Sequence, residues 1–209
     1  MVTNLCVSRI VFAAKCTQAA MLAALFLIIL ACADKRVVLV PAPNATLASQ
    51  PNSAQASNQG VSVLVQTNAW DDYPRHLEAQ LVPIKIVIQN HSGHDLAIRY
   101  NSFALICRNN CRINDIPPYQ IRTYDYEHLE PRWAYSDAYH AQVRLPTESM
   151  LREALAEGII NDGGEISGFL YFPWPTHPSP AITFQAVWID AGTHQKFGET
   201  VIPLSLKWL

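Results

Sequence analysis

Charged residues are scarce in this chain of 209 residues. Only 15% of them carry charge, and 15 Lys and Arg stand against 17 Asp and Glu, which gives a net charge of −2 at pH 7. The sequence contains no basic stripe of the kind that nucleic-acid-binding proteins present to phosphates. We therefore expect no nucleic acid among its partners.

The motifs of common catalytic sites are missing as well. The sequence has no Gly-x-Ser-x-Gly, no phosphate-binding glycine loop and no His-Glu-x-x-His. We therefore predict no catalytic residues, no metal site, no cofactor and no enzymatic activity. The alternative is an envelope hydrolase or metal-handling protein that uses histidines and carboxylates. Its candidate residues are His91, His94 and Asp95 in one turn, and His128, His140, Asp125, Glu127, Glu130 and Asp137 further along.

No apolar run is long enough for an ordinary membrane-spanning helix. Residues 19–33 are apolar throughout, whereas a span needs about 20 residues. Arg9 and Lys15 precede this run, and a basic segment followed by a short apolar one is typical of a signal peptide. We predict a signal peptide of lipoprotein type at residues 1–31. Lys35 and Arg36 follow directly, so an uncleaved anchor is the alternative.

The end of the apolar run resembles the bacterial lipobox. Ile29, Leu30, Ala31 and Cys32 supply an aliphatic residue at −3, a small residue at −1 and the cysteine itself. The resemblance implies cleavage before Cys32 and a diacylglycerol on its thiol. We therefore predict a lipid anchor to the bacterial cell envelope, with the protein facing the periplasm or the cell surface.

The number of cysteines agrees with this interpretation. The chain has five, an odd number, of which Cys6 and Cys16 would leave with the signal peptide and Cys32 would carry lipid. Cys107 and Cys111 remain, separated by three residues. Exported proteins fold in an oxidising compartment, so we predict a disulfide between them. A Cys-x3-Cys metal half-site is the alternative, although no second half-site follows.

Beyond Cys32, composition and periodicity divide the chain in two. Residues 41–60 are uncharged and rich in Pro, Ala, Ser, Asn and Gln, so we predict a flexible tether over residues 32–60. From Val61 to Leu209 apolar residues alternate with polar ones in short segments. This pattern predicts an all-β immunoglobulin-like antiparallel sandwich. The expected strands are residues 61–67, 81–90, 95–100, 103–109, 166–172, 182–190 and 199–206.

One helix is expected among the strands, at residues 148–157, because Thr147 precedes it and Gly158 follows it. We predict a crossover helix that covers one open end of the sandwich. The next strand has large apolar residues on both faces. Leu170 and Phe172 should enter the core beside Ile86 and Trp188, while Phe169 and Tyr171 should lie under the helix or under the aromatic loop described next.

A long segment without periodicity, residues 117–140, is unusually aromatic. Long irregular loops in compact domains are often functional, and Tyr and Trp supply large contact areas at low entropic cost. We predict a candidate interaction surface for an envelope protein partner; the alternative is that the loop only packs on the sandwich edge. The aromatic residues are Tyr119, Tyr124, Tyr126, Trp133, Tyr135 and Tyr139.

Two stretches resemble a known group of proteins. "PIKIVIQNHSGHDLAIRYNSFALI" is similar to the opening hairpins of small immunoglobulin-like domains in exported bacterial lipoproteins. "LPTESMLREALAEGIINDGGEISGFLYFP" is similar to the later part of a proteobacterial lipoprotein family of unknown function. Together they cover about residues 80 to 206 without the middle loop. The resemblance implies fold and export but no activity, so we expect a lipid-anchored envelope protein with a binding or structural role.

Overall fold

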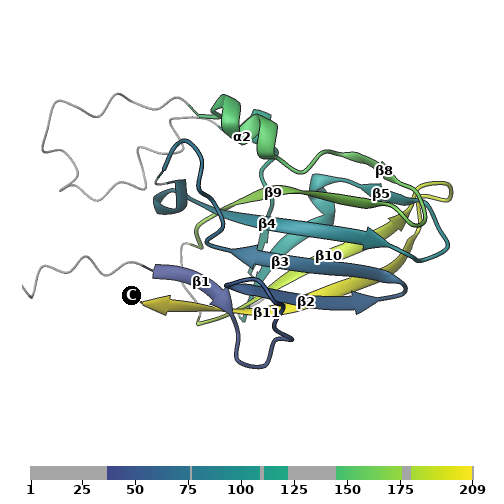
Figure 1. Ribbon diagram of the computed structural model, residues 1–209, viewed down its shortest axis with the longest axis horizontal. Coiled ribbons are helices and arrows are strands. Elements are labelled where there is room, and N and C mark those ends of the chain that lie inside the picture. Colours follow the sequence, from purple (N-terminus) through teal and green to yellow (C-terminus); the bar gives the residue numbers. More distant parts are fainter. Residues whose placement is uncertain (1–36, 76, 109–110, 122–144, 176–179, 209) are drawn as a thin grey trace, which may run out of the picture. The chain divides into compact units, whose positions relative to one another are not determined.

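A computed structural model of the chain describes residues 37–75, 77–108, 111–121, 145–175 and 180–208. The described residues between Val37 and Trp208 form two antiparallel sheets packed face to face, which confirms the predicted β-sandwich (Figure 1). The smaller sheet has the strand order β2-β3-β4-β9. Its strands are β2 (Ser53–Asn58), β3 (Val61–Thr67), β4 (Leu81–Asn90) and β9 (Glu165–Pro173).

The larger sheet has seven strands. Its main order is β1-β11-β10-β5-β8, and β6 pairs with both β10 and β7. Its strands are β1 (Val37–Pro41), β5 (Leu96–Ile98), β6 (Phe103–Cys107), β7 (Arg112–Asn114), β8 (Gly158–Ile160), β10 (Ala181–Asp190) and β11 (Lys196–Trp208).

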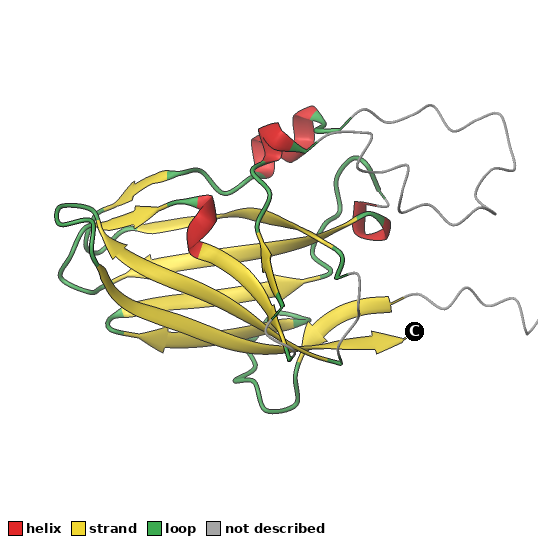
Figure 2. Cartoon of the chain, turned by 180° about the vertical axis from the view of Figure 1, so that it is seen from behind, coloured by secondary structure: helices red, strands yellow, loops and turns green. Residues whose placement is uncertain are grey.

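Helices are few and lie at the periphery of the sheets (Figure 2). The α-helix α2 spans Glu148–Glu153. Three single 3-10 turns are η1 (Leu77–Ala79), η2 (Tyr100–Ser102) and η3 (Pro118–Gln120). Within the described part of the chain the two sheets therefore carry almost all of the fold.

The core between the sheets follows from the alternation along the strands. In β3, Val61, Val63 and Val65 are fully buried while the residues between them are partly exposed. In β10, Trp188 is fully buried, and its indole N–H donates to Thr200 Oγ1 at 2.9 Å. Because that hydrogen bond satisfies the one polar group of the ring, the largest core side chain is buried without an unpaired donor.

The predicted register of β9 is confirmed. Leu170 and Phe172 lie in the main core. Phe169 and Tyr171 belong to a second apolar cluster on the other face of the sheet. We call it the outer cluster; its buried members are Trp70, Leu77, Leu81, Ile121, Leu145, Met150, Phe169 and Tyr171.

The helix begins where predicted, but it is shorter and covers a different part of the sandwich. The side chain of Thr147 caps it by accepting from Met150 N, as the sequence indicates, but α2 ends at Glu153. Ala154 then forms a parallel bridge with Phe169, and Leu155 N donates to Phe169 O at 2.9 Å. Pairing with β9 thus replaces the last turn of the predicted helix. The helix contributes Met150 to the outer cluster and covers the outer face of β9 rather than an open end.

The tether prediction is wrong from Val37 onward. Residues of β1 pair with β11, and residues of β2 pair with β3, so the sandwich begins at Val37 and not at Val61. Composition misled here because β2 is an edge strand, SAQASN, with only its first two residues buried. An edge strand needs no apolar run, and its polar residues look like a linker. The signal peptide predicted at residues 1–31 lies outside the described residues.

Candidate functional site

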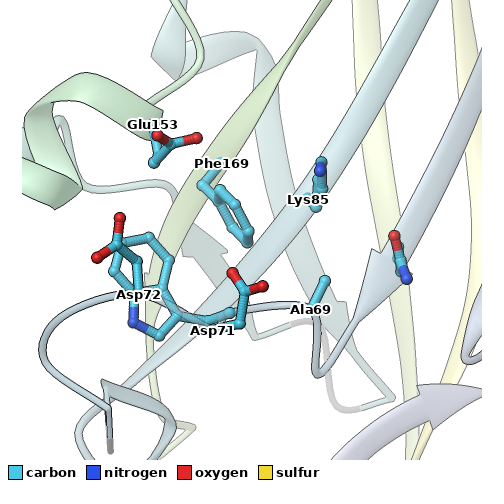
Figure 3. Close-up of a pocket in the computed structure, with 8 residues that line it drawn as sticks. Ala69, Asp71, Asp72, Lys85, Glu153 and Phe169 are labelled. Atoms are coloured by element: carbon cyan, nitrogen blue, oxygen red, sulfur yellow. The ribbon is translucent and has the colours of Figure 1, made fainter.

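A pocket of about 350 Å³ lies on the outer face of the smaller sheet (Figure 3). Its floor comes from one residue of each of three neighbouring strands: Gln66 of β3, Lys85 of β4 and Phe169 of β9. These residues are direct register partners, Gln66 with Lys85 and Lys85 with Phe169. The sheet therefore fixes their spacing. Small-ligand pockets start at about 300 Å³, so this one suits a small polar group.

One wall of the pocket is the segment that follows β3, which Trp70 holds in place. The Trp70 ring is buried edge-on against Phe169, with centroids 5.1 Å apart, and its Nε1 donates to Pro74 O at 2.9 Å. The next two residues, Asp71 and Asp72, also line the pocket. Burial of the indole thus places two carboxylates at the rim.

Asp72 joins this wall to helix α2. Its carboxylate accepts hydrogen bonds from Tyr73 N at 2.7 Å and from Ser149 Oγ at 3.0 Å, and it pairs with Arg152 at 2.6 Å. The backbone hydrogen bond from Tyr73, followed by those other contacts, lowers the pKa of Asp72 below its ordinary value. This carboxylate is therefore ionised at neutral pH and already occupied by protein partners.

Glu153 at the end of α2 completes the rim. It accepts from Arg152 Nε at 3.0 Å, so one guanidinium serves both Asp72 and Glu153. All three side chains are substantially exposed, and such surface pairs contribute little to stability. Their effect is to partly neutralise two of the three carboxylates that line the pocket.

Two opposite charges in the pocket have no such partner. Within the described ranges, Asp71 makes no hydrogen bond or ion pair, and Lys85 makes only a cation–π contact, with Nζ 5.9 Å from the Phe169 ring centroid. Figure 3 shows both side chains around Phe169. A carboxylate and an ammonium are thus available to a ligand at one apolar surface.

Another carboxyl group, that of Asp115, is buried but does not line the pocket. It is 7% exposed; its Oδ1 accepts from Tyr171 N at 3.1 Å, and its Oδ2 has no hydrogen-bond partner in the described structure. Burial, with a smaller effect from nearby Glu157, raises the pKa of Asp115 to about 8. Asp115 is therefore mostly protonated at neutral pH and acts as a buried structural group.

The histidines of the predicted alternative lie at the other end of the sandwich, in the turns. His94 Nδ1 is 2.8 Å from Asp190 Oδ2, whereas His91 and Asp95 make only backbone hydrogen bonds in the described structure. Among the described residues no group of three or more His, Cys, Asp or Glu is placed to hold a metal ion. His128, His140 and the four carboxylates at residues 125–137 lie outside the described residues.

Cys107 and Cys111 lie together at the end of the β6–β7 hairpin. Their Sγ atoms are 2.9 Å apart, and Cys107 N donates to Cys111 O at 2.8 Å. Both are free thiols in this structure, and burial raises the pKa of Cys107 to about 11. The disulfide stays a prediction. Cys32, the predicted lipid site, lies outside the described residues.

Of the predicted aromatic surface, only Tyr119 can be placed. It belongs to η3, its side chain is 64% exposed, and its ring centroid is 6.5 Å from that of Tyr100. Ile121 and Leu145, on either side of the long segment, are both buried in the outer cluster. The other five aromatic residues, Tyr124, Tyr126, Trp133, Tyr135 and Tyr139, lie outside the described residues.

The pocket itself was hardly predictable from the sequence. Asp71 and Asp72 follow Trp70 in "NAWDDYP", a segment that has no periodicity. Lys85 is the only charged residue of β4. A charge in the middle of this largely apolar strand was a usable signal that the outer face of the strand is not wholly covered.

The sequence matches no protein-family model and none of the curated proteins. Three solved structures resemble the fold distantly. The Bacillus subtilis protein ycdA, assigned as a lipoprotein, is 13% identical with a TM-score of 0.42; the match covers 72% of this chain and 38% of ycdA. Bacillus subtilis yjhA is 9% identical with a TM-score of 0.39, covering 68% of this chain and 92% of yjhA.

The third structure is MPT63, a secreted protein from Mycobacterium tuberculosis, which is 7% identical with a TM-score of 0.32 and is matched over 75% of this chain and 96% of its own. This chain spans well under half the length of ycdA. At these sequence identities and TM-scores, the structural similarities assign no function. None of the helices in the described ranges is long and apolar enough to cross a membrane.

Proposed function

We propose that this protein is a lipid-anchored protein of the cell envelope that binds a small ligand carrying both a positive and a negative group. The observation that carries the proposal is the pair of unsatisfied opposite charges, Asp71 and Lys85, in one pocket. Asp71 would accept hydrogen bonds from an ammonium group. Lys85 would donate to a phosphate or carboxylate, and charge-assisted hydrogen bonds of this kind are the stronger ones.

The charges around the pocket favour a zwitterion over a simple anion. Asp71, Asp72 and Glu153 line the pocket together with one ammonium, that of Lys85, and Arg152 balances part of the negative charge through its ion pairs with Asp72 and Glu153. A ligand with only negative charge would leave Asp71 unpaired and face repulsion from the rim. Binding sites commonly reject a wrong ligand because that ligand would leave a charge of the site unpaired.

We propose binding rather than catalysis because Asp72, one of the carboxylates that line the pocket, is held in its ionised form and is not suited to act as a general acid. A general acid needs a pKa near the working pH. The pKa of Asp72 is lowered, and the carboxyl with the raised pKa, Asp115, does not line the pocket. The anchor rests on the lipobox-like residues that end in Cys32.

The proposal can be tested by calorimetric titration of the mature protein, purified in detergent, with O-phosphoethanolamine. Ethanolamine and inorganic phosphate serve as half-ligands and should bind much more weakly. Asp71→Asn and Lys85→Gln should each weaken binding about tenfold or more, because each removes one charged hydrogen bond.

Two matched changes away from the pocket provide the controls. Asp95→Asn in a far turn and Lys207→Gln on β11 alter the same charges on exposed side chains. Both should bind as the wild type does. Equal binding by all five proteins, or no binding by the wild type, would contradict the proposed function.

A further inference from the structure

We infer that the ligand of this pocket is the headgroup of a zwitterionic phospholipid in the membrane that holds the anchor. The inference rests on the proposed function and names the source of its ligand. It follows from how close the anchor must hold the pocket to the membrane, and from the chemistry of the two free charges.

The link between anchor and sandwich is short. Only residues 33–36 separate Cys32 from Val37, the first residue of β1. Five steps of fully extended chain reach at most about 18 Å. A tether extending to residue 60 would have let the domain move far from the bilayer, but this link holds the start of β1 close to it.

The start of β1 lies at the same end of the sandwich as the pocket. Leu39 O accepts a hydrogen bond at 3.0 Å from the side chain of Asn68, and Val37 lines a small hollow together with Asn68. The next residue, Ala69, already lines the pocket. The end that the anchor draws toward the membrane is therefore the end nearest to the pocket, which opens on the outer face of the smaller sheet.

An exposed aromatic side chain lies next to the pocket. Tyr73, directly after Asp72, is 54% exposed, and Tyr is enriched at membrane–water interfaces. Charge does not separate the two ends, because Arg75 is exposed beside the carboxylates of the pocket rim, and Asp95 and Lys196 are both exposed at the far end.

Phosphoethanolamine matches the pocket group by group. Its ammonium would meet Asp71, and its phosphate would meet Lys85 with the amide of Gln66 beside it. Phosphatidylglycerol has the phosphate but no ammonium, so it would leave Asp71 unpaired. The pocket should therefore select phosphatidylethanolamine from a mixed bilayer.

The test uses the lipidated protein in vesicles of equal parts phosphatidylethanolamine and phosphatidylglycerol. A photo-crosslinking amino acid replaces Ala69, with the exposed Tyr73 as a second position in case the first disturbs folding. After irradiation, mass spectrometry identifies the attached lipid. We expect adducts with phosphatidylethanolamine to exceed those with phosphatidylglycerol about fivefold or more, and Asp71→Asn to bring the ratio close to one.

A probe at Thr193 in a far turn is the control and should give few lipid adducts. Equal lipid adducts at Ala69 and Thr193, or a ratio near one in the wild type, would overturn the inference. If soluble O-phosphoethanolamine still bound in titration, the proposed function would survive with a soluble ligand. If the titration failed as well, both would be wrong.

Discussion

At the scale of single residues, the ionisation of Asp115 links the stability of the fold to pH. Its pKa lies near 8 in the folded protein and near 3.8 when exposed. The folded state therefore holds the proton more tightly, so the stabilisation is complete below about pH 4 and is lost as the pH rises through about 8. The slope is at most about 1.4 kcal/mol per pH unit.

Asp115→Asn imitates the protonated carboxyl and keeps the oxygen that accepts from Tyr171 N. Urea unfolding of the variant should show much less loss of stability between pH 5 and pH 8 than the wild type. If the two curves ran parallel, the ionisation of Asp115 would not be the source of the pH dependence.

Two neighbouring phenylalanines of β9 should respond differently to truncation. Phe172 is fully buried between the sheets, and losing a core Phe typically costs about 3–5 kcal/mol of a stability of about 5–15 kcal/mol. Phe172→Ala should nearly unfold the domain. Phe169→Ala should cost less, since it opens the outer cluster beside Trp70, and should speed hydrogen exchange in α2.

Circular dichroism and hydrogen exchange would measure both effects. Ligand titration adds a second readout, because Phe169 lines the pocket and Phe172 does not. Tolerance of Phe172→Ala with unfolding by Phe169→Ala would contradict the assignment of the two faces.

At the scale of elements, the crossing of residues 154–155 over β9 depends on one glycine. A Cβ added at Gly168 would lie 2.5 Å from Leu155 Cα and 2.6 Å from Leu155 N, which are backbone atoms. Gly168→Ala must therefore separate the two segments and weaken the bond from Leu155 N to Phe169 O. Overpacking of this kind costs about 1–3 kcal/mol.

Gly158→Ala is the matched control, because a Cβ there meets nothing within 4 Å. It should change the free energy of unfolding by no more than about 0.5 kcal/mol, as surface substitutions usually do. Urea unfolding compares the two. Equal effects would mean that the close approach at Gly168 is not needed.

Periodicity predicted the long elements well and the edges poorly. The strand at 61–67 and the strand at 81–90 match β3 and β4, because their alternating valines and isoleucines fill the core. β1, β2, β7 and β8 were missed since edge or three-residue strands need only part of one face buried. The pocket was missed because it joins Asp71, Lys85 and Glu153 from three separate elements, a proximity that only the folded sheet creates.

At the scale of the whole molecule, the position of the pocket relative to a membrane depends on an anchor close to the first strand. The distance from Cys32 to β1 decides which end of the sandwich meets the membrane, and hence what the pocket can reach. An uncleaved apolar helix at residues 19–33 would also hold the domain at a membrane. Lipid on Cys32 distinguishes the two.

Metabolic labelling with a fatty-acid probe measures this directly. The wild-type protein should take up the label, and Cys32→Ser should not, while Cys107→Ser should label as the wild type does because its thiol is buried in the sandwich. Equal labelling of the wild type and Cys32→Ser, or labelling of neither, would contradict the anchor and with it the placement of the pocket at the membrane.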